Sequence, residues 1–131
     1  MRSEVETYGV TSSVARLRRV LVRTPVTTGD FEGAGWRRPD AAALLRQHEA
    51  FCELLSELGC DVVVAPPAEG LVDACYMYDS AFTIGDGAIV LRSAKPARST
   101  EWEPAAAALA DAGVPIVAHL EGDARADGGD L

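Results

Sequence analysis

The sequence DAAALLRQHEAFCELLSELGCDVVVA, residues 40–65, runs from a helix pattern directly into a strand pattern. Asp40 is typical of a helix N-cap, and Gly59 is typical of the residue that stops a helix. The β-branched run at residues 60–65, closed by two prolines, predicts a strand. Three- and four-residue spacing predicts one buried stripe on the helix, formed by Leu44, Leu45, His48, Phe51, Cys52, Leu55 and Leu58.

The residues on either side extend this pattern. Residues 19–23, RVLVR, predict a buried strand that ends at Thr24-Pro25. Because a strand, a helix and a second strand then follow one another, the sequence indicates α/β architecture. Between strand patterns at residues 81–84 and 88–91, Gly85-Asp86-Gly87 predicts a β-hairpin.

A second helix and a last strand are expected before the polar tail. The helix begins within residues 98–103, where Thr100 and Glu103 have the spacing of a capping box, and it stops at Gly113. Its expected core-facing residues are Trp102, Ala105, Ala106 and Leu109. Residues 114–117 predict a short strand, and Gly128-Gly129 predicts a turn that leads into further structure.

Composition and charge limit the class of function. The 131 residues suit one domain over 1–131, with 12 basic and 20 acidic residues and a net charge of -8. This charge disfavours binding to nucleic acid or to an anionic membrane surface. No stretch approaches the roughly 20 apolar residues of a membrane span, and MRSEVETYGV lacks the order of a signal peptide, so a cytoplasmic protein is expected.

The cysteines and histidines give little sign of chemistry by themselves. Cys52, Cys60 and Cys75 form no C-x-x-C pair, so neither a disulfide framework nor a zinc site is indicated, and no metal or organic cofactor is expected. All three cysteines are interpreted as packing residues. A site formed by Cys75 and His119 remains an alternative. The irregular loop at residues 26–39 is a candidate lid.

The acids that bracket DACYMYD, Asp73 and Asp79, lie where a loop enters a strand. Two carboxylates offer planar acceptors that match the donor fork of a guanidinium ion, whereas solvated loop acids are the plainer interpretation. Arg98 has two interpretations as well. It can clamp a ligand carboxylate, or it can pair on the surface with Glu101 or Glu103.

Four segments in order resemble the guanidino-group modifying enzymes, and most closely the dimethylarginine dimethylaminohydrolases. They are Asp73 to Asp79, GAIVLR at residues 87–92, KPARSTE at residues 95–101, and DGGD at residues 127–130. The resemblance implies a partial pseudo-symmetric α/β propeller with about two of five blades. It also implies that the chain is the N-terminal half of such an enzyme, ending after the Gly-Gly-Asp turn.

The resemblance implies a role for each matching residue. Asp79 is similar to the acid that grips the guanidinium group, and Asp73 to the acid near the amino group of the substrate. Arg98 is similar to an arginine that holds the substrate carboxylate. Asp127 is similar to the catalytic acid that orients a histidine and touches the guanidinium group. Tyr78 departs from the family, which usually has an acid there, and this leaves the substrate open.

The implied reaction is attack of a cysteine thiolate on the guanidinium carbon of arginine or methylated arginine, giving citrulline and an amine after hydrolysis. The family's histidine and cysteine come from the second half of its chain, so this chain alone is expected to be inactive. A guanidino-binding module without catalysis and half of an amidinotransferase are the alternatives. A partial propeller also exposes apolar flanks, so the chain is expected to need the missing half or to self-associate.

Overall fold

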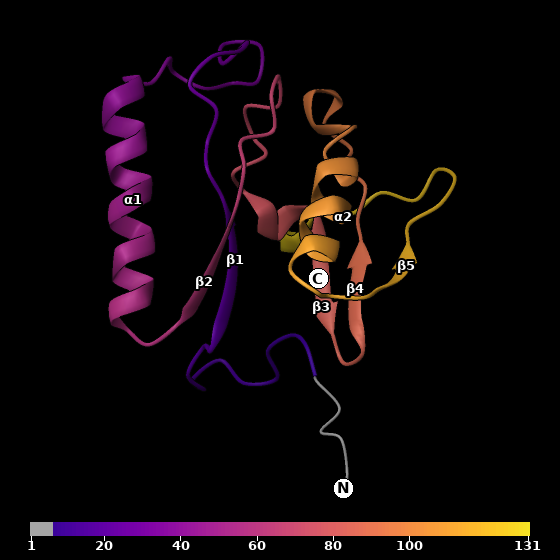
Figure 1. The fold of residues 1–131 in the computed structure, drawn as a ribbon. Coiled ribbons are helices and arrows are strands. Elements are labelled where there is room, and N and C mark those ends of the chain that lie inside the picture. Colours follow the sequence, from indigo (N-terminus) through magenta and orange to yellow (C-terminus); the bar gives the residue numbers. More distant parts are fainter. Residues whose placement is uncertain (1–6) are drawn as a thin grey trace, which may run out of the picture.

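A computed structural model describes residues 7–131 of the chain. Residues 1–6, which form part of the segment tested above for a signal peptide, lie outside the described residues. The first structural unit is β1 (Arg19–Arg23), α1 (Ala41–Glu57) and β2 (Asp61–Ala65). The two strands pair in parallel, with Leu21 opposite Val63, and α1 is the crossover that parallel pairing requires. Figure 1 shows α1 on the outer side of this two-stranded sheet.

The ends of α1 follow the sequence pattern. The Asp40 carboxylate accepts a hydrogen bond from the Ala43 amide at 2.7 Å, which satisfies one of the donors left open at a helix start. At the other end, Gly59 adopts a φ of 94°, a conformation that a residue with a Cβ rarely adopts. The predicted helix and strand over residues 40–65 are therefore confirmed.

The predicted burial of the α1 stripe is wrong. No residue of α1 is buried among the described residues, and Phe51 and Leu58 are 51% and 58% exposed. Two strands about 5 Å apart form too narrow a surface to cover a broad apolar arc. His48 and Cys52 lie half-buried, whereas Phe51, Leu54 and Leu58 remain exposed to solvent.

The second unit is a mixed sheet covered by a helix. The predicted hairpin forms from β3 (Ala81–Ile84) and β4 (Gly87–Val90), and β5 (Ile116–His119) pairs in parallel with β4. Helix α2 (Trp102–Asp111) packs on this sheet, as Figure 1 shows. The core consists of Ala88, Val90 and Leu109, with Trp102, Ala106 and Ile116 packed against it.

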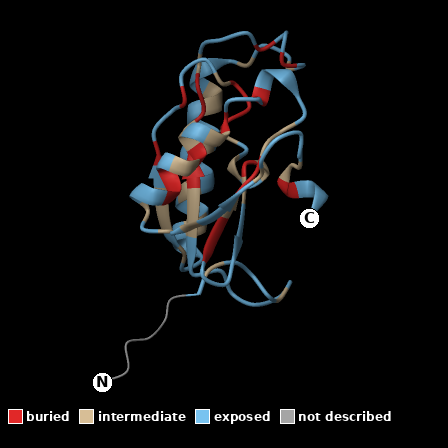
Figure 2. Ribbon diagram, turned by 90° about the vertical axis from the view of Figure 1, so that its right-hand side faces the viewer, coloured by how far each residue is buried: buried red, intermediate tan, exposed pale blue. Residues whose placement is uncertain are grey.

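Three 3-10 turns complete the fold and lie near the candidate site residues. They are η1 (Met77–Asp79), η2 (Pro96–Arg98) and η3 (Gly128–Asp130). Figure 2 shows that buried segments occur along the strands and also in the loops at one end of the molecule.

Helix α2 starts at Trp102, within the predicted range of residues 98–103. The predicted Thr100–Glu103 capping box does not form, since the N-cap is Glu101 and makes no side-chain capping bond. Residues before it are in the turn η2, and Pro104 lies in the first helical turn, where its missing N–H leaves no bond unmade. The last strand covers residues 116–119 rather than 114–117, since the Val114 amide still bonds back to Leu109.

The two units contact each other through β1. Leu21 packs against the core of the mixed sheet. The buried Arg23 guanidinium donates to the carbonyl oxygen of Pro66 at 2.7 Å and to that of Pro104 at 2.9 Å, and its burial lowers the pKa of Arg23 from its ordinary value. Arg23 therefore joins the start of α2 to the end of the parallel sheet.

The predicted lid is a packed loop. Phe31 is 1% exposed, and with Val26, Ala34 and Val72 it forms a small core of its own, against which Trp36 packs. No described helix is long and apolar enough to cross a bilayer.

Candidate functional site

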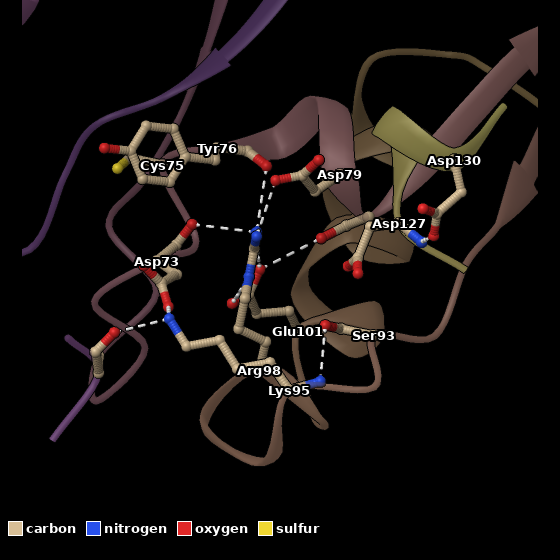
Figure 3. A network of polar contacts seen from close by, with 12 residues as sticks. Asp73, Cys75, Tyr76, Asp79, Ser93, Lys95, Arg98, Glu101, Asp127 and Asp130 are labelled. Carbon is tan, nitrogen blue, oxygen red and sulfur yellow. Dashed lines mark hydrogen bonds and ion pairs between the residues drawn. The ribbon is translucent and has the colours of Figure 1, made fainter. Parts of the chain in front are cut away.

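Arg98 is the centre of a buried polar network (Figure 3). It ends η2, is 8% exposed, and grips both oxygens of Glu101, with Nε and Nη2 each at 2.7 Å. Its Nη1 atom donates to Oδ2 of Asp79 at 2.8 Å. Burial alone would lower the pKa of Arg98, but hydrogen bonds to Glu101 and Asp79 outweigh burial and raise it. Asp79 is therefore held in place by a permanently charged partner.

Arg98 pairs with Glu101, as one of its two interpretations predicts, but the predicted surface location of this pair is wrong. Glu101 is 3% exposed and also accepts a hydrogen bond from the Ser80 hydroxyl at 3.3 Å. The remaining Nη2 contacts of Arg98 are to the carbonyl oxygens of Asp73 and Tyr76, at 3.2 and 3.3 Å. Arg98 thus ties the loop before η1 to the start of α2.

The Asp73 carboxylate also accepts hydrogen bonds from other residues of the chain. Its carboxylate accepts from the Trp36 indole N–H at 2.6 Å and from the Lys95 ammonium at 2.7 Å. Burial would raise the pKa of Asp73, but these two hydrogen bonds lower it below its ordinary value. For Asp73, whose side chain is 6% exposed, the interpretation as a solvated loop acid is wrong.

Sequence reasoning missed Lys95 and Trp36. Lys95 is the single lysine of the chain and lies within a segment that carries the family resemblance, and Trp36 is a large aromatic residue in an otherwise polar loop. The rarity of lysine and the presence of a tryptophan in a polar loop are the signals that the sequence offers for these two residues. No local spacing links either residue to Asp73, because the contacts span 22 and 37 residues of sequence.

Asp127 reaches the site because η3 packs directly on η1. A Cβ added at Gly128 would collide with the backbone carbonyl of Tyr78 and would lie 3.3 Å from the Asp79 Cα, so only glycine permits this approach. The structure thus brings Asp127 beside Asp79, 48 residues apart in the sequence, as Figure 3 shows.

Asp127 carries a buried oxygen with no partner. Its amide donates to Oδ2 of Asp130 at 2.8 Å, but within residues 7–131 its own Oδ1 is buried and accepts no hydrogen bond. A buried acceptor left unsatisfied costs about 1–3 kcal/mol. Arg98 already holds Asp79 through Oδ2, whereas Oδ1 of Asp127 has no partner, so the two acids together can accept N–H donors from a ligand cation.

The cysteines do not form a nucleophilic site in the described residues. Burial raises the pKa of the Cys75 thiol, and its Sγ lies 3.9 Å from the carbonyl oxygen of Val72. The His119 ring meets Trp102 edge-on, and the described residues show no contact between Cys75 and His119. Cys52 lies 3.5 Å from His48, with its pKa also raised by burial. No group of three or more metal-ligating side chains occurs among the described residues.

Comparison with known proteins places these observations in a family context. No family model matches the chain. The human and bovine proteins named "Putative hydrolase DDAH2" are each 33% identical to it over 122 residues, which are 90% of this chain. The chain spans 43% of the length of these curated relatives.

Solved structures agree in fold. A mutant of the dimethylarginine dimethylaminohydrolase from Pseudomonas aeruginosa, complexed with citrulline, superposes with a TM-score of 0.73 over 88% of this chain and 46% of its own, at 23% identity. An AgrE mutant with L-arginine gives a TM-score of 0.71 at 16% identity, over 87% of this chain and 18% of its own. The predicted α/β class and partial propeller are confirmed. Sequence and fold together confirm the likeness of this chain to the guanidino-group modifying superfamily, over the part of those proteins that it spans.

Proposed function

We propose that this chain supplies the carboxylate side of a guanidinium-binding site in a cysteine-dependent, dimethylargininase-like hydrolase. The observation that carries the proposal is the buried, unsatisfied Oδ1 of Asp127 beside Asp79. The nucleophilic cysteine and the histidine that moves protons lie outside this chain, and Asp127 orients that histidine.

The chemistry of the two acids suits a guanidinium ion. Guanidinium is planar, stays charged and presents five N–H donors, so two carboxylates at an angle can bind it at once. Asp79 is fixed through Oδ2 by Arg98, and its side chain remains 21% exposed, so a ligand can reach it. A charge-assisted hydrogen bond to Asp127 would remove the cost of its unsatisfied oxygen.

Two further observations support this proposal. The relatives in the comparison include a protein named as a hydrolase and structures with citrulline or L-arginine bound. In the described residues Arg98 links the Asp79 carboxylate to the backbone carbonyl of Asp73, so the three residues belong to one network (Figure 3).

A second candidate is a binding module without chemistry. The raised pKa of Cys75 weighs against chemistry by this chain's own thiol, since a thiol that resists ionisation is a poor nucleophile. This candidate shares the Asp79–Asp127 site, and it differs only in predicting that no added segment confers turnover.

Isothermal titration of methylguanidine into the chain tests the shared site. We expect binding in the millimolar range that weakens at least about tenfold in Asp79→Asn and in Asp127→Asn, because each variant removes a charged acceptor. Asp123→Asn is the matched control, because this exposed acid lies on the same tail and should leave binding unchanged. No heat at millimolar ligand, or equal binding by all variants, would contradict the proposal.

A further inference from the structure

Glu101 is an acid buried within the Arg98 network (Figure 3). It is 3% exposed, and its two carboxylate oxygens accept hydrogen bonds from Nε and Nη2 of Arg98, each at 2.7 Å. The Ser80 hydroxyl donates to the same carboxylate at 3.3 Å. A ligand therefore has no access to Glu101, and any effect of this acid on binding must act through the residues that it contacts.

Glu101 also acts on a second buried arginine. Arg23, from β1, is 4% exposed and donates to the carbonyl oxygens of Pro66 and Pro104, which are neutral partners. Burial lowers the pKa of Arg23, whereas the negative charge of Glu101 raises it. Since a charge without a counter-ion is costly inside a protein, Glu101 is the shared counter-ion of Arg23 and Arg98.

Arg98 contacts two acids that differ in exposure. It holds Glu101 with two hydrogen bonds and Asp79 with one, which runs from Nη1 to Oδ2 at 2.8 Å. The Asp79 side chain is 21% exposed, whereas that of Glu101 is 3% exposed. Because a buried bidentate pair is stronger than a single, partly exposed contact, Glu101 balances most of the charge of Arg98. Asp79 thus keeps negative charge for a cation that comes from outside the chain.

We propose that Glu101 is a positioning residue for guanidinium binding, because it holds Arg98 and balances its charge, so that Asp79 stays negative toward a ligand cation. This inference rests on the proposed guanidinium site at Asp79 and Asp127. Without Glu101, the charge of Arg98 would be balanced by Asp79 alone, and the site would attract a cation less strongly. Glu101 itself touches no ligand.

Isothermal titration of methylguanidine into Glu101→Gln tests the proposal. We expect binding at least about tenfold weaker than in the wild type, because Arg98 would then neutralise Asp79. Glu103→Gln is the matched control, since it removes the same charge from an exposed residue in the first turn of α2 and should keep the wild-type affinity. Both variants lose one negative charge, so general attraction of the ligand is equal in the two.

A double variant separates charge balance from support of the fold. Arg98→Gln combined with Glu101→Gln removes both charges of the pair and keeps the net charge of -8. We expect its affinity to return to within about threefold of the wild type, because no uncompensated cation remains beside Asp79. A residue that only supported the fold would not give this recovery. Removing both partners of a buried pair is also tolerated better than removing one, so the double variant carries the test if Glu101→Gln does not fold.

The failures are distinguishable. Wild-type affinity in Glu101→Gln, with binding still weakened in Asp79→Asn, overturns the role of Glu101 and leaves the guanidinium site intact. A folded double variant that binds at least about tenfold more weakly than the wild type overturns the charge balance as well. Absence of binding by the wild type, or equal binding by Asp79→Asn, overturns the guanidinium site, and the inference with it.

Discussion

Arg98 is the residue on which the stability of the site region depends most. Removing it in Arg98→Met would leave Glu101, which is 3% exposed, and Asp79 without their cation. We expect a loss of about 3–5 kcal/mol in the free energy of unfolding, the usual cost of breaking one side of a buried ion pair. Urea unfolding followed by far-ultraviolet circular dichroism measures it.

The control for Arg98 is an ion pair of the same chemistry on the surface. Arg38 and Glu32 lie 2.9 Å apart, and both side chains are 59% exposed. Arg38→Met should lower the free energy of unfolding far less than Arg98→Met does, because water screens such pairs. A similar small loss in Arg98→Met would show that its network adds no stability.

Asp73 makes the stability of the site region depend on pH. Because its pKa is lowered in the folded chain, the charged form stabilises the fold above the ordinary pKa of about 4, and this contribution disappears as the pH falls through the lowered value. The difference in unfolding free energy between the wild type and Asp73→Asn should therefore be constant from pH 7 to about pH 5 and shrink below pH 4. Urea titrations across this range measure it.

Single residues were predictable where the signal was local. Asp40 and Gly59 mark the ends of α1 because capping and positive φ depend on neighbours within a few residues. The contacts of Asp73 with Trp36 and Lys95 could not be predicted, because they depend on how two loops pack. The order of the acids contributed to the family resemblance on which the proposed guanidinium site rests.

Among the structural elements, the two packed turns η1 and η3 are the ones that assemble the acid pair. Gly128→Ala would place a Cβ against the Tyr78 carbonyl, which is backbone and cannot move aside cheaply. We expect a destabilisation of about 1–3 kcal/mol and weaker methylguanidine binding, since overpacking separates Asp127 from Asp79. Thermal unfolding and calorimetry measure the two effects.

The neighbouring glycine provides the control for this prediction. A Cβ at Gly129 would lie 3.1 Å from the Tyr78 hydroxyl, the far end of an exposed side chain that can shift. Gly129→Ala should therefore change stability and binding less than Gly128→Ala. The reverse order would show that η3 does not approach η1 in the way described.

Element types were easier to predict than element surroundings. The period of three to four residues in α1 and the β-branched run in β2 are properties of the sequence alone, and both elements form. Burial of Phe51 and Leu58 depends on what lies opposite the helix, and in the described residues the two-stranded sheet does not reach them. The missing Thr100–Glu103 capping box has a similar reason, since the buried Arg98 network lies next to residues 96–101, which are turns.

At the scale of the whole molecule, the exposed apolar residues of α1 predict self-association. Phe51, Leu54 and Leu58 are each at least half exposed and lie within two turns of one helix. Burying them against a second copy is favourable, at about 25 cal/mol per Å² of apolar surface. We expect the weight-average mass in sedimentation equilibrium to rise with concentration.

A paired substitution tests this prediction. The double variant Phe51→Ser and Leu54→Ser should sediment closer to the monomer mass. Arg46→Ser with Glu53→Ser changes two exposed polar residues of the same helix and keeps the net charge, so it should behave as the wild type does. Monomeric wild type throughout the micromolar range would rule out association through α1.

Lys95, whose ammonium group bridges the Asp73 carboxylate and the carbonyl oxygen of Ala34, is also the single lysine in the sequence. Reagents that acylate primary amines consequently have one side-chain target in the chain. The two hydrogen bonds favour the protonated, unreactive form of this amine, so loosening of the bridge should raise its rate of acylation. The rate at which the peptide that contains Lys95 gains mass therefore reports on the contact between Lys95 and the loop at residues 26–39.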